Sequence, residues 1–235
     1  MFDRIAPRYD LLNRLFSLGR DVSWRKEVAR HLPPGSALQV LDLATGTGDV
    51  LIALHRYSGR VDMGVGMDMA ARMLELARNK ITSRGLSERL ALVVGDARRI
   101  PFGDGCFDAV TIAFGIRNVE PVRTGLSEMR RLLNTNGKVL ILEFSLPGNR
   151  LLRALYLMYF RYVMPVLGAF ISGDSYAYRY LNRTVETFPY GREFCRLMEE
   201  AGFRGVVAHP LTFGIATVYE GWKDTPPSEK GEARR

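Results

Sequence analysis

Cysteine and histidine are scarce in this chain. Its 235 residues include two cysteines, which are far apart and form no CxxC pair, and three histidines, which lack the spacing of metal ligands: Cys106, Cys195, His31, His55 and His209. A disulfide scaffold and a zinc site built on cysteine are therefore excluded, and the thiols fit a reducing cytoplasm. We predict no bound metal and a cytoplasmic location.

Long uncharged hydrophobic runs are also missing. The first ten residues, MFDRIAPRYD, carry charges that argue against a secretory leader. The most apolar stretch, LLRALYLMYFRYVMPVLGAFI, contains Arg153, Arg161 and Pro165, whereas a membrane span needs about twenty mostly apolar residues. We expect a buried helix pair that covers the active site over residues 147–190. The plain alternative is an insertion that only packs on the sheet.

Acidic residues do not balance the basic ones, and the net charge is +8. Residues 1–31 hold seven basic and four acidic side chains, and residues 147–190 hold five and two. A basic surface suits nucleic acid, anionic lipid or an acidic substrate, but there is no basic run or RNA-binding motif, so we expect no nucleic acid. Seven of the ten tyrosines also lie in 147–190. This aromatic, basic segment indicates a hydrophobic substrate or peripheral contact with the inner face of a membrane. The alternative is a basic surface that is only exposed to solvent.

What the chain does have is a regular alternation of apolar strands and helices. The alternation predicts a mostly parallel seven-stranded sheet with helices on both faces and an antiparallel last strand. We assign one α/β domain to 1–222, with a helical cover over 1–35, the insertion at 147–190 and a disordered tail at 223–235. The expected strands are 38–43, 61–67, 90–94, 107–113, 138–144, 206–208 and 215–222, and the expected helices are 2–31, 49–57, 70–84, 122–133 and 192–201.

The stretch VLDLATGTGDV, residues 40–50, combines a strand, a glycine turn and a helix start. A carboxylate, Asp68, follows about twenty residues later, as in nucleoside-binding βαβ units. The third glycine of a dinucleotide turn is replaced by Leu51. The carboxylates of Asp42 and Asp49 would repel a pyrophosphate but tolerate a cationic sulfonium. We therefore predict S-adenosylmethionine rather than NAD, with an ordinary tight turn as the alternative. The expected contacts are Asp42, Gly46, Thr47, Gly48, Asp68, whose two oxygens suit the ribose hydroxyls, and Met69.

The chain resembles the C-methyltransferases of ubiquinone and menaquinone biosynthesis, which have a Rossmann-like methyltransferase fold. The resemblance rests on YDLLNRLFSLGRDVSW (9–24), LDLATGTGD (41–49), FGIRN (114–118), RLLNTNGKVLILEFS (131–145), DSYAYRYL (174–181) and EEAGF (199–203). Leu12 replaces a usual methionine, Asp21 a usual histidine, and Asn134–Gly137 a usual Lys-Pro-Gly-Gly turn.

Carried over residue by residue, the resemblance implies cofactor contacts at Thr47, Asp68, Asp96, Ala97 and Ala113. Asp96 would accept the adenine amino group, and the Ala97 amide would donate to a ring nitrogen. A helix N-cap is the alternative role for Asp96. The family usually has serine where this chain has Ala113, so only a backbone contact would survive there.

The implied reaction is methylation of a ring carbon of a polyprenylated quinol, from demethylmenaquinol to menaquinol, or in ubiquinone biosynthesis, or both. We expect Arg117 to hold the developing phenolate or a water that removes its proton, Asn118 to assist, and Tyr9 to orient the quinol. An ion pair with Glu120 or Glu143 is the alternative for Arg117. The rival functions are methylation of another lipid or phenol, and a non-catalytic cofactor-binding protein; a homo-oligomer is compatible with the sequence.

Overall fold

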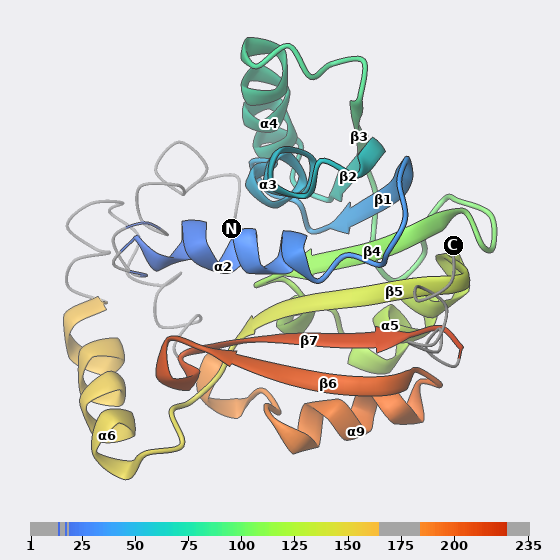
Figure 1. The fold of residues 1–235 in the computed structure, drawn as a ribbon. Coiled ribbons are helices and arrows are strands. Elements are labelled where there is room, and N and C mark those ends of the chain that lie inside the picture. The colour runs from blue at the N-terminus through green and yellow to red at the C-terminus, as the bar shows by residue number, and fades with distance from the viewer. Residues whose placement is uncertain (1–13, 15–16, 18, 165–183, 225–235) are drawn as a thin grey trace, which may run out of the picture.

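A computed structural model describes residues 14, 17, 19–164 and 184–224. Its centre is a seven-stranded sheet with the order β3-β2-β1-β4-β5-β7-β6 (Figure 1). The strands are β1 (Leu38–Leu43), β2 (Val61–Asp68), β3 (Leu90–Val94), β4 (Phe107–Ala113), β5 (Leu133–Phe144), β6 (Arg204–Leu211) and β7 (Ala216–Trp222).

The sheet is parallel except at one edge. β1 pairs in parallel with β2 and β4, and the parallel run continues through β3 and β5. β7 pairs antiparallel with both β5 and β6, because the short turn between the last two strands leaves no room for a crossover. The predicted mostly parallel sheet with an antiparallel last strand is confirmed.

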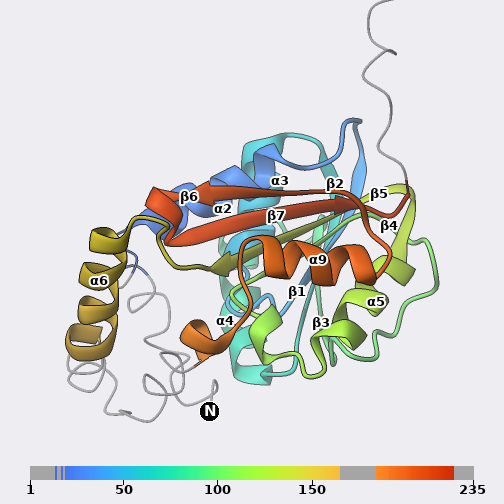
Figure 2. The ribbon, with the colours of Figure 1, turned by 90° about the horizontal axis from the view of Figure 1, so that it is seen from below.

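Helices cover both faces of the sheet. They are α2 (Arg20–Arg30), α3 (Asp49–Ser58), α4 (Ala71–Ser83), α5 (Val122–Leu132) and α9 (Arg192–Glu200), whereas α6 (Arg150–Met158) lies beyond the ends of the strands (Figure 1). Figure 2 shows α2 and α3 on one side of the strands and α5 and α9 on the other. Alternate strand residues serve the two cores: Leu41 faces α5 and α9, and Val40 faces α2 and α3. A strand buried on both faces reads as a continuous apolar run, which is why these strands are recognisable in the sequence.

Two expected boundaries are wrong. β5 begins at Leu133, directly after α5, where we predicted a helix end and an Asn-Thr-Asn-Gly turn. Pairing of Phe107 with Leu133 extends the strand, and an irregular register absorbs the polar residues 134–137. β6 runs over eight residues instead of three, because its pairing with β7 continues on both sides of the short apolar run.

The covering segments are described in part. α2 lies within the expected helical region 2–31, whereas Tyr9 lies outside the described residues, as do 165–183. α6 continues into a π-helix, η2 (Tyr159–Val163), in which Phe160 is buried, whereas the residues of α6 itself are exposed or half-buried. The second half of the expected helix pair falls outside the described residues, so the predicted cover over the active site stays a prediction. Lys223, assigned to the tail, donates its backbone N–H to Gly137 on β5 at 2.9 Å. Among the described residues no helix combines the length and apolarity that crossing a membrane requires.

Candidate active site

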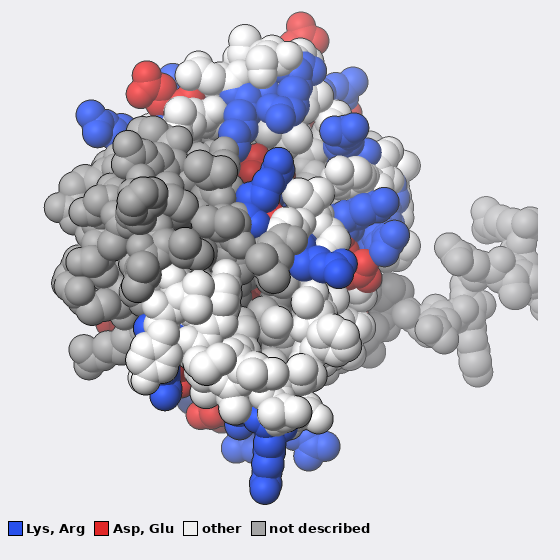
Figure 3. Space-filling model, turned by 90° about the vertical axis from the view of Figure 1, so that its left-hand side faces the viewer, with Lys and Arg blue, Asp and Glu red and all other residues white. Residues whose placement is uncertain are grey.

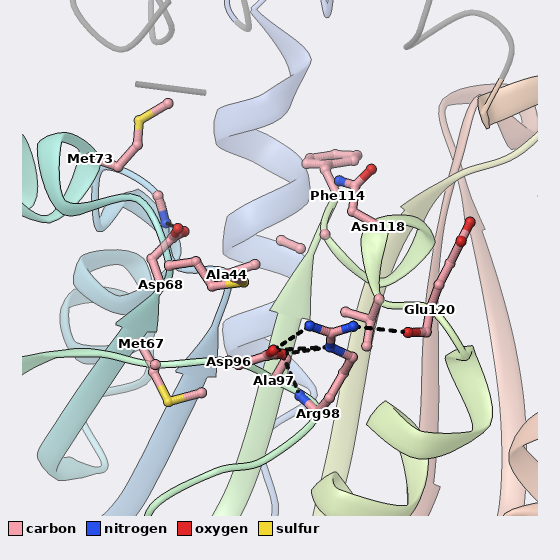
Figure 4. Close-up of a pocket in the computed structure, with 16 residues that line it drawn as sticks. Ala44, Met67, Asp68, Met73, Asp96, Ala97, Arg98, Phe114, Asn118 and Glu120 are labelled. Carbon is pink, nitrogen blue, oxygen red and sulfur yellow. Dashed lines mark hydrogen bonds and ion pairs between the residues drawn. The ribbon is translucent and has the colours of Figure 1, made fainter. Parts of the chain in front are cut away.

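A cavity of about 580 Å³ lies where β1, β2, β3 and β4 end. Ligands of open α/β sheets bind at the carboxyl ends of the strands, and this volume suits a small organic ligand. Figure 4 shows Asp68 on one side of the cavity and Asn118 with Phe114 on the other. Of the predicted site residues, seven line it: Gly46, Asp68, Met69, Asp96, Ala97, Ala113 and Asn118.

The turn after β1 forms one wall of the cavity. Ala44 and Gly46 both have left-handed backbone, with φ of 48° and 55°, which directs the chain sharply from strand to helix. Gly48 begins α3 at φ 80°, and a Cβ there would lie 3.1 Å from the Cβ of Ala77 on α4. Gly48 thus allows α3 and α4 to pack closely, whereas the third glycine of a dinucleotide turn serves the packing of a helix on a strand.

Asp42 lies beneath this turn and is fully buried. Its two oxygens accept hydrogen bonds from Thr45 at 2.7 Å and Thr111 at 2.6 Å. Burial raises the pKa of Asp42 to about 6, against the lowering effect of the two hydroxyls. Asp42 is not among the described residues that line the cavity, and neither are Thr47 and Gly48. The structure gives Asp42 a supporting position, because its oxygens tie the β1 turn to β4.

Asp68 is held in place by the backbone around it. One carboxylate oxygen accepts from the Gly46 N–H at 2.9 Å and the other from the Ala70 N–H at 2.8 Å. An ionised carboxylate offers about four acceptor sites, so each oxygen keeps capacity for a further donor. The side chain is thus fixed at the cavity wall with room to accept hydroxyl groups.

Asp96 is engaged by Arg98 and caps no helix. Its carboxylate accepts from the Arg98 backbone N–H at 2.9 Å and from Arg98 Nη2 at 2.6 Å. The hydrogen bonds from Arg98 lower the pKa of Asp96. Residues 95–106 contain no helix, so the N-cap alternative is wrong. The side chain instead closes a local turn, which is the same capping chemistry outside a helix.

The segment after β4 forms the opposite wall. Phe114 has a left-handed φ of 54°, and a Cβ at Gly115 would lie 2.6 Å from the Cβ of Ala44. Glycine is required at 115 because the β1 and β4 turns approach so closely. Ala113 lines the cavity and brings no hydroxyl to it. The short 3₁₀ helix η1 (Ile116–Asn118) follows and carries the next two predicted residues.

Asn118 lines the cavity, and Arg117 lies beside it in the protein interior. Arg117 Nη1 contacts Glu143 Oε1 at 2.5 Å, with side-chain exposures of 7% and 1%. The guanidinium also lies 5.5 Å from the centre of the Phe144 ring. The ion pair with Glu143 that was the alternative for Arg117 is confirmed. Arg117 is not among the described residues that line the cavity, but its guanidinium has donors beyond the one that Glu143 accepts.

Within the part of the chain that the structure describes, three polar atoms around this ion pair have no hydrogen-bond partner: Arg117 Nε, Glu143 Oε2 and Tyr156 Oη on α6. Burial raises the pKa of Glu143 despite the nearby Arg117 guanidinium, and burial also raises the pKa of Tyr156. Buried polar groups are nearly always paired. These three atoms are available to pair with a polar ligand group or with ordered water.

Several cavity residues were missed by sequence reasoning: Ala44, Met67, Met73, Gly95, Arg98, Phe114, Gly115, Val119 and Glu120. Most are apolar or small and carry no chemical signal of their own. Their location could have been predicted from the sequence, because these residues lie at or shortly after the predicted ends of the same four strands.

Two of the histidines meet although their spacing did not predict it. His31 Nδ1 lies 2.8 Å from Glu220 Oε2, and His209 Nε2 lies 3.7 Å from the same oxygen. The three side chains form a group whose ligand atoms are close enough for a metal ion. Lys138 Nζ, however, already lies 2.7 Å from that oxygen and supplies a positive charge, so we keep the prediction of no bound metal.

Solved structures place the fold in a known class. A SAM-dependent methyltransferase from Aquifex aeolicus has a TM-score of 0.63 and 17% identity, covering 91% of this chain and 97% of its own. A SAM-dependent methyltransferase from Thermotoga maritima has a TM-score of 0.66 and 18% identity, covering 95% and 98%. With its sheet order and strand-end cavity, the protein has the fold of S-adenosylmethionine-dependent methyltransferases.

Sequence similarity then gives the family. Residues 1–223 match the model of the ubiE/COQ5 methyltransferase family, and the chain belongs to that family. The ubiquinone/menaquinone biosynthesis C-methyltransferase UbiE of Geotalea uraniireducens is 45% identical over 95% of this chain and 94% of its own length. The demethylmenaquinone methyltransferase of Deinococcus radiodurans is 45% identical over 95% of this chain and 91% of its own length. The family implies S-adenosylmethionine as methyl donor.

Proposed function

We propose that this enzyme methylates a ring carbon of a polyprenylated quinol, converting demethylmenaquinol to menaquinol, acting in ubiquinone biosynthesis, or both. Relatives that carry these two names match nearly the whole chain. The structural observation that carries the proposal is the buried Arg117–Glu143 pair, in which Arg117 directly precedes the cavity residue Asn118. It offers a positive charge and unpaired polar atoms where a phenol would enter.

The cavity fits S-adenosylmethionine on its nucleoside side. The two fixed oxygens of Asp68 would accept the ribose hydroxyls. Asp96 and Ala97 would lie along the adenine, although Arg98 competes for the Asp96 carboxylate. When bound, the sulfonium supplies an already activated methyl group, so we assign no metal to the reaction. The apolar side chains of Met69 and Met73 complete this side.

The acceptor carbon becomes nucleophilic when a neighbouring hydroxyl loses its proton. A phenol has a pKa of about 10 in water, so the site must stabilise the phenolate. Arg117 is suited to this because its guanidinium stays charged and has donors to spare. It would hold the phenolate oxygen or a water that carries the proton away, and Asn118 would add a hydrogen bond from the cavity wall. Tyr9, in the undescribed segment, is proposed to orient the quinol.

The test is transfer of label from the methyl donor. The protein is incubated with radiolabelled S-adenosylmethionine and, separately, a demethylmenaquinol, a methoxy-polyprenyl-benzoquinol and a phospholipid extract. We expect label in one or both quinols and none in the lipid. Arg117→Lys, which keeps the charge but loses the planar fork, should retain cofactor binding and lose most turnover. Label in the phospholipid alone, or full activity of Arg117→Lys, would refute the assignment.

A further inference from the structure

The helix formed by α6 and η2 presents an apolar stripe to solvent. Leu151, Leu155, Met158 and Tyr162 follow one another at intervals of four, three and four residues, which places them on one helical face. They are 70%, 50%, 55% and 70% exposed. Scattered exposed apolar residues are ordinary, but a contiguous group marks an interaction site.

The opposite face of the same helix is anchored to the protein. Phe160 and Met164 are buried against Val185 and are flanked by Phe144. Arg153 points the same way and donates a hydrogen bond to the Tyr190 hydroxyl. The exposed stripe is therefore a fixed surface on a packed helix. Figure 3 shows this side of the molecule, where uncharged residues gather over the lower part and Lys and Arg side chains lie at the lower edge.

A second element carries an exposed aromatic ring beside this helix. Phe213, in the turn η3 (Thr212–Gly214) between β6 and β7, is 80% exposed. Thr212 and Phe213 both have left-handed backbone, with φ of 47° and 59°, a conformation that is unfavourable for residues other than glycine. A Cβ at Gly214 would lie 3.5 Å from the Cα of Pro147, just before α6. A strained turn thus holds an apolar side chain outward, close to the residues that lead into α6.

Basic residues border this surface. Residues 147–173 contain three arginines and no acidic residue, and one of the three, Arg153, lies on the anchored face of the helix. Arg150 and Arg161 are exposed, and Arg161 pairs with Glu186. With that glutamate counted, residues 147–190 still hold five basic against two acidic side chains. An apolar stripe with basic borders is the pattern of interfacial helices on anionic membranes.

We propose that the α6 surface, defined as Leu151, Leu155, Met158, Tyr162 and Phe213, docks on an anionic lipid bilayer. The choice of occupant rests on the proposed function, because a polyprenylated quinol resides in the bilayer and must reach the cavity from it. A second copy of the chain fits less well, since its own α6 surface would bring arginines against arginines. The apolar side chains enter the interface while the arginines contact anionic headgroups.

The experiment is vesicle flotation of the full chain. We compare neutral phosphatidylcholine vesicles with vesicles in which about one third of the lipid is anionic phosphatidylglycerol. We expect binding to the anionic vesicles, weakened by salt because surface charge is screened. Leu155→Asp/Met158→Asp should lower partitioning at least tenfold (about 1.4 kcal/mol). The matched control is Tyr57→Asp, an exposed aromatic residue on α3, which should bind like wild type.

Three results would overturn the proposal. In the first, the wild type does not bind anionic vesicles. In the second, the double variant binds them as well as the wild type does. In the third, light scattering shows that the wild type is a dimer that does not bind vesicles and that the double variant is a monomer. Arg150→Glu is a second variant that removes only charge and should also weaken flotation. Activity on a short-chain, water-soluble quinol separates the two hypotheses. Retained activity with failed flotation refutes docking alone, whereas flotation without quinol methylation refutes the proposed function alone.

Discussion

Replacing Arg117 should cost stability as well as activity. The Arg117→Met change leaves Glu143 buried, 1% exposed and without the guanidinium that lies 2.5 Å away. Breaking a buried ion pair by removing one partner costs about 3–5 kcal/mol, because the remaining charge is desolvated. The free energy of unfolding of a domain is only about 5–15 kcal/mol, so the variant should lose a large share of its stability.

The loss should depend on pH in a definite direction. Burial already raises the pKa of Glu143 above its usual value, and loss of Arg117 raises it further. A carboxyl whose folded pKa is raised contributes stability that is present below the unfolded pKa of 4.5 and is lost as the pH rises through the folded pKa. The destabilisation of Arg117→Met should therefore be largest at high pH and shrink as the pH falls and Glu143 takes up a proton.

The assay is urea unfolding at pH 5, 6.5 and 8 of wild type, Arg117→Met, Glu143→Gln and the double variant. If the two side chains act as a pair, the double variant should be destabilised by clearly less than the sum of the single changes. Additive losses, or a loss for Arg117→Met that is equal at all three pH values, would refute the reasoning. Turnover must be compared at temperatures where each variant stays folded, so that lost catalysis is not confused with lost fold.

Three further predictions concern other carboxylates. Asp68→Ala should weaken cofactor binding at least tenfold by calorimetry, since it removes the acceptor at the cavity wall and the ties to the β1 turn; wild-type affinity would exclude the ribose contact. Thr111→Val should destabilise the fold by about 1–3 kcal/mol in urea, because it leaves one oxygen of buried Asp42 without its donor; an unchanged midpoint would contradict this. Burial opposes ionisation of Glu220, but hydrogen bonds from His31 and Lys138 lower its pKa to about 2. The ionised Glu220 therefore stabilises the fold above pH 4.5, and this stabilisation is lost as the pH falls towards 2. Glu220→Gln should make the free energy of unfolding fall less steeply between these pH values; an unchanged slope would refute the contribution of Glu220.

The strands were predictable because their signal is local. β1, β3 and β4 have the bounds that their apolar runs predict. β5 and β6 extend further, because pairing with neighbours recruits polar residues such as Asn134 that no strand pattern includes. Boundaries set by a partner strand cannot be read from the strand's own composition.

The candidate site was predictable in part. Gly46, Asp68 and Asn118 follow strand ends, and their positions at the cavity follow from the topology. Asp42 was expected to contact the cofactor, but its carboxylate is taken up by Thr111, which is distant in sequence. Residues this far apart meet only when β1 and β4 pair, so the sequence showed the charge without showing its partner.

The sequence by itself determined the class of fold, the nucleoside-binding turn and the family, because these depend on runs, glycines and motifs within short windows. The tertiary structure alone decided that Asp42 is buried, that Arg117 pairs with Glu143, and which face of α6 stays exposed. The physical reason is that burial and pairing are properties of the neighbours in space. An apolar helix stripe looks the same in sequence whether it meets a core, a partner or a membrane.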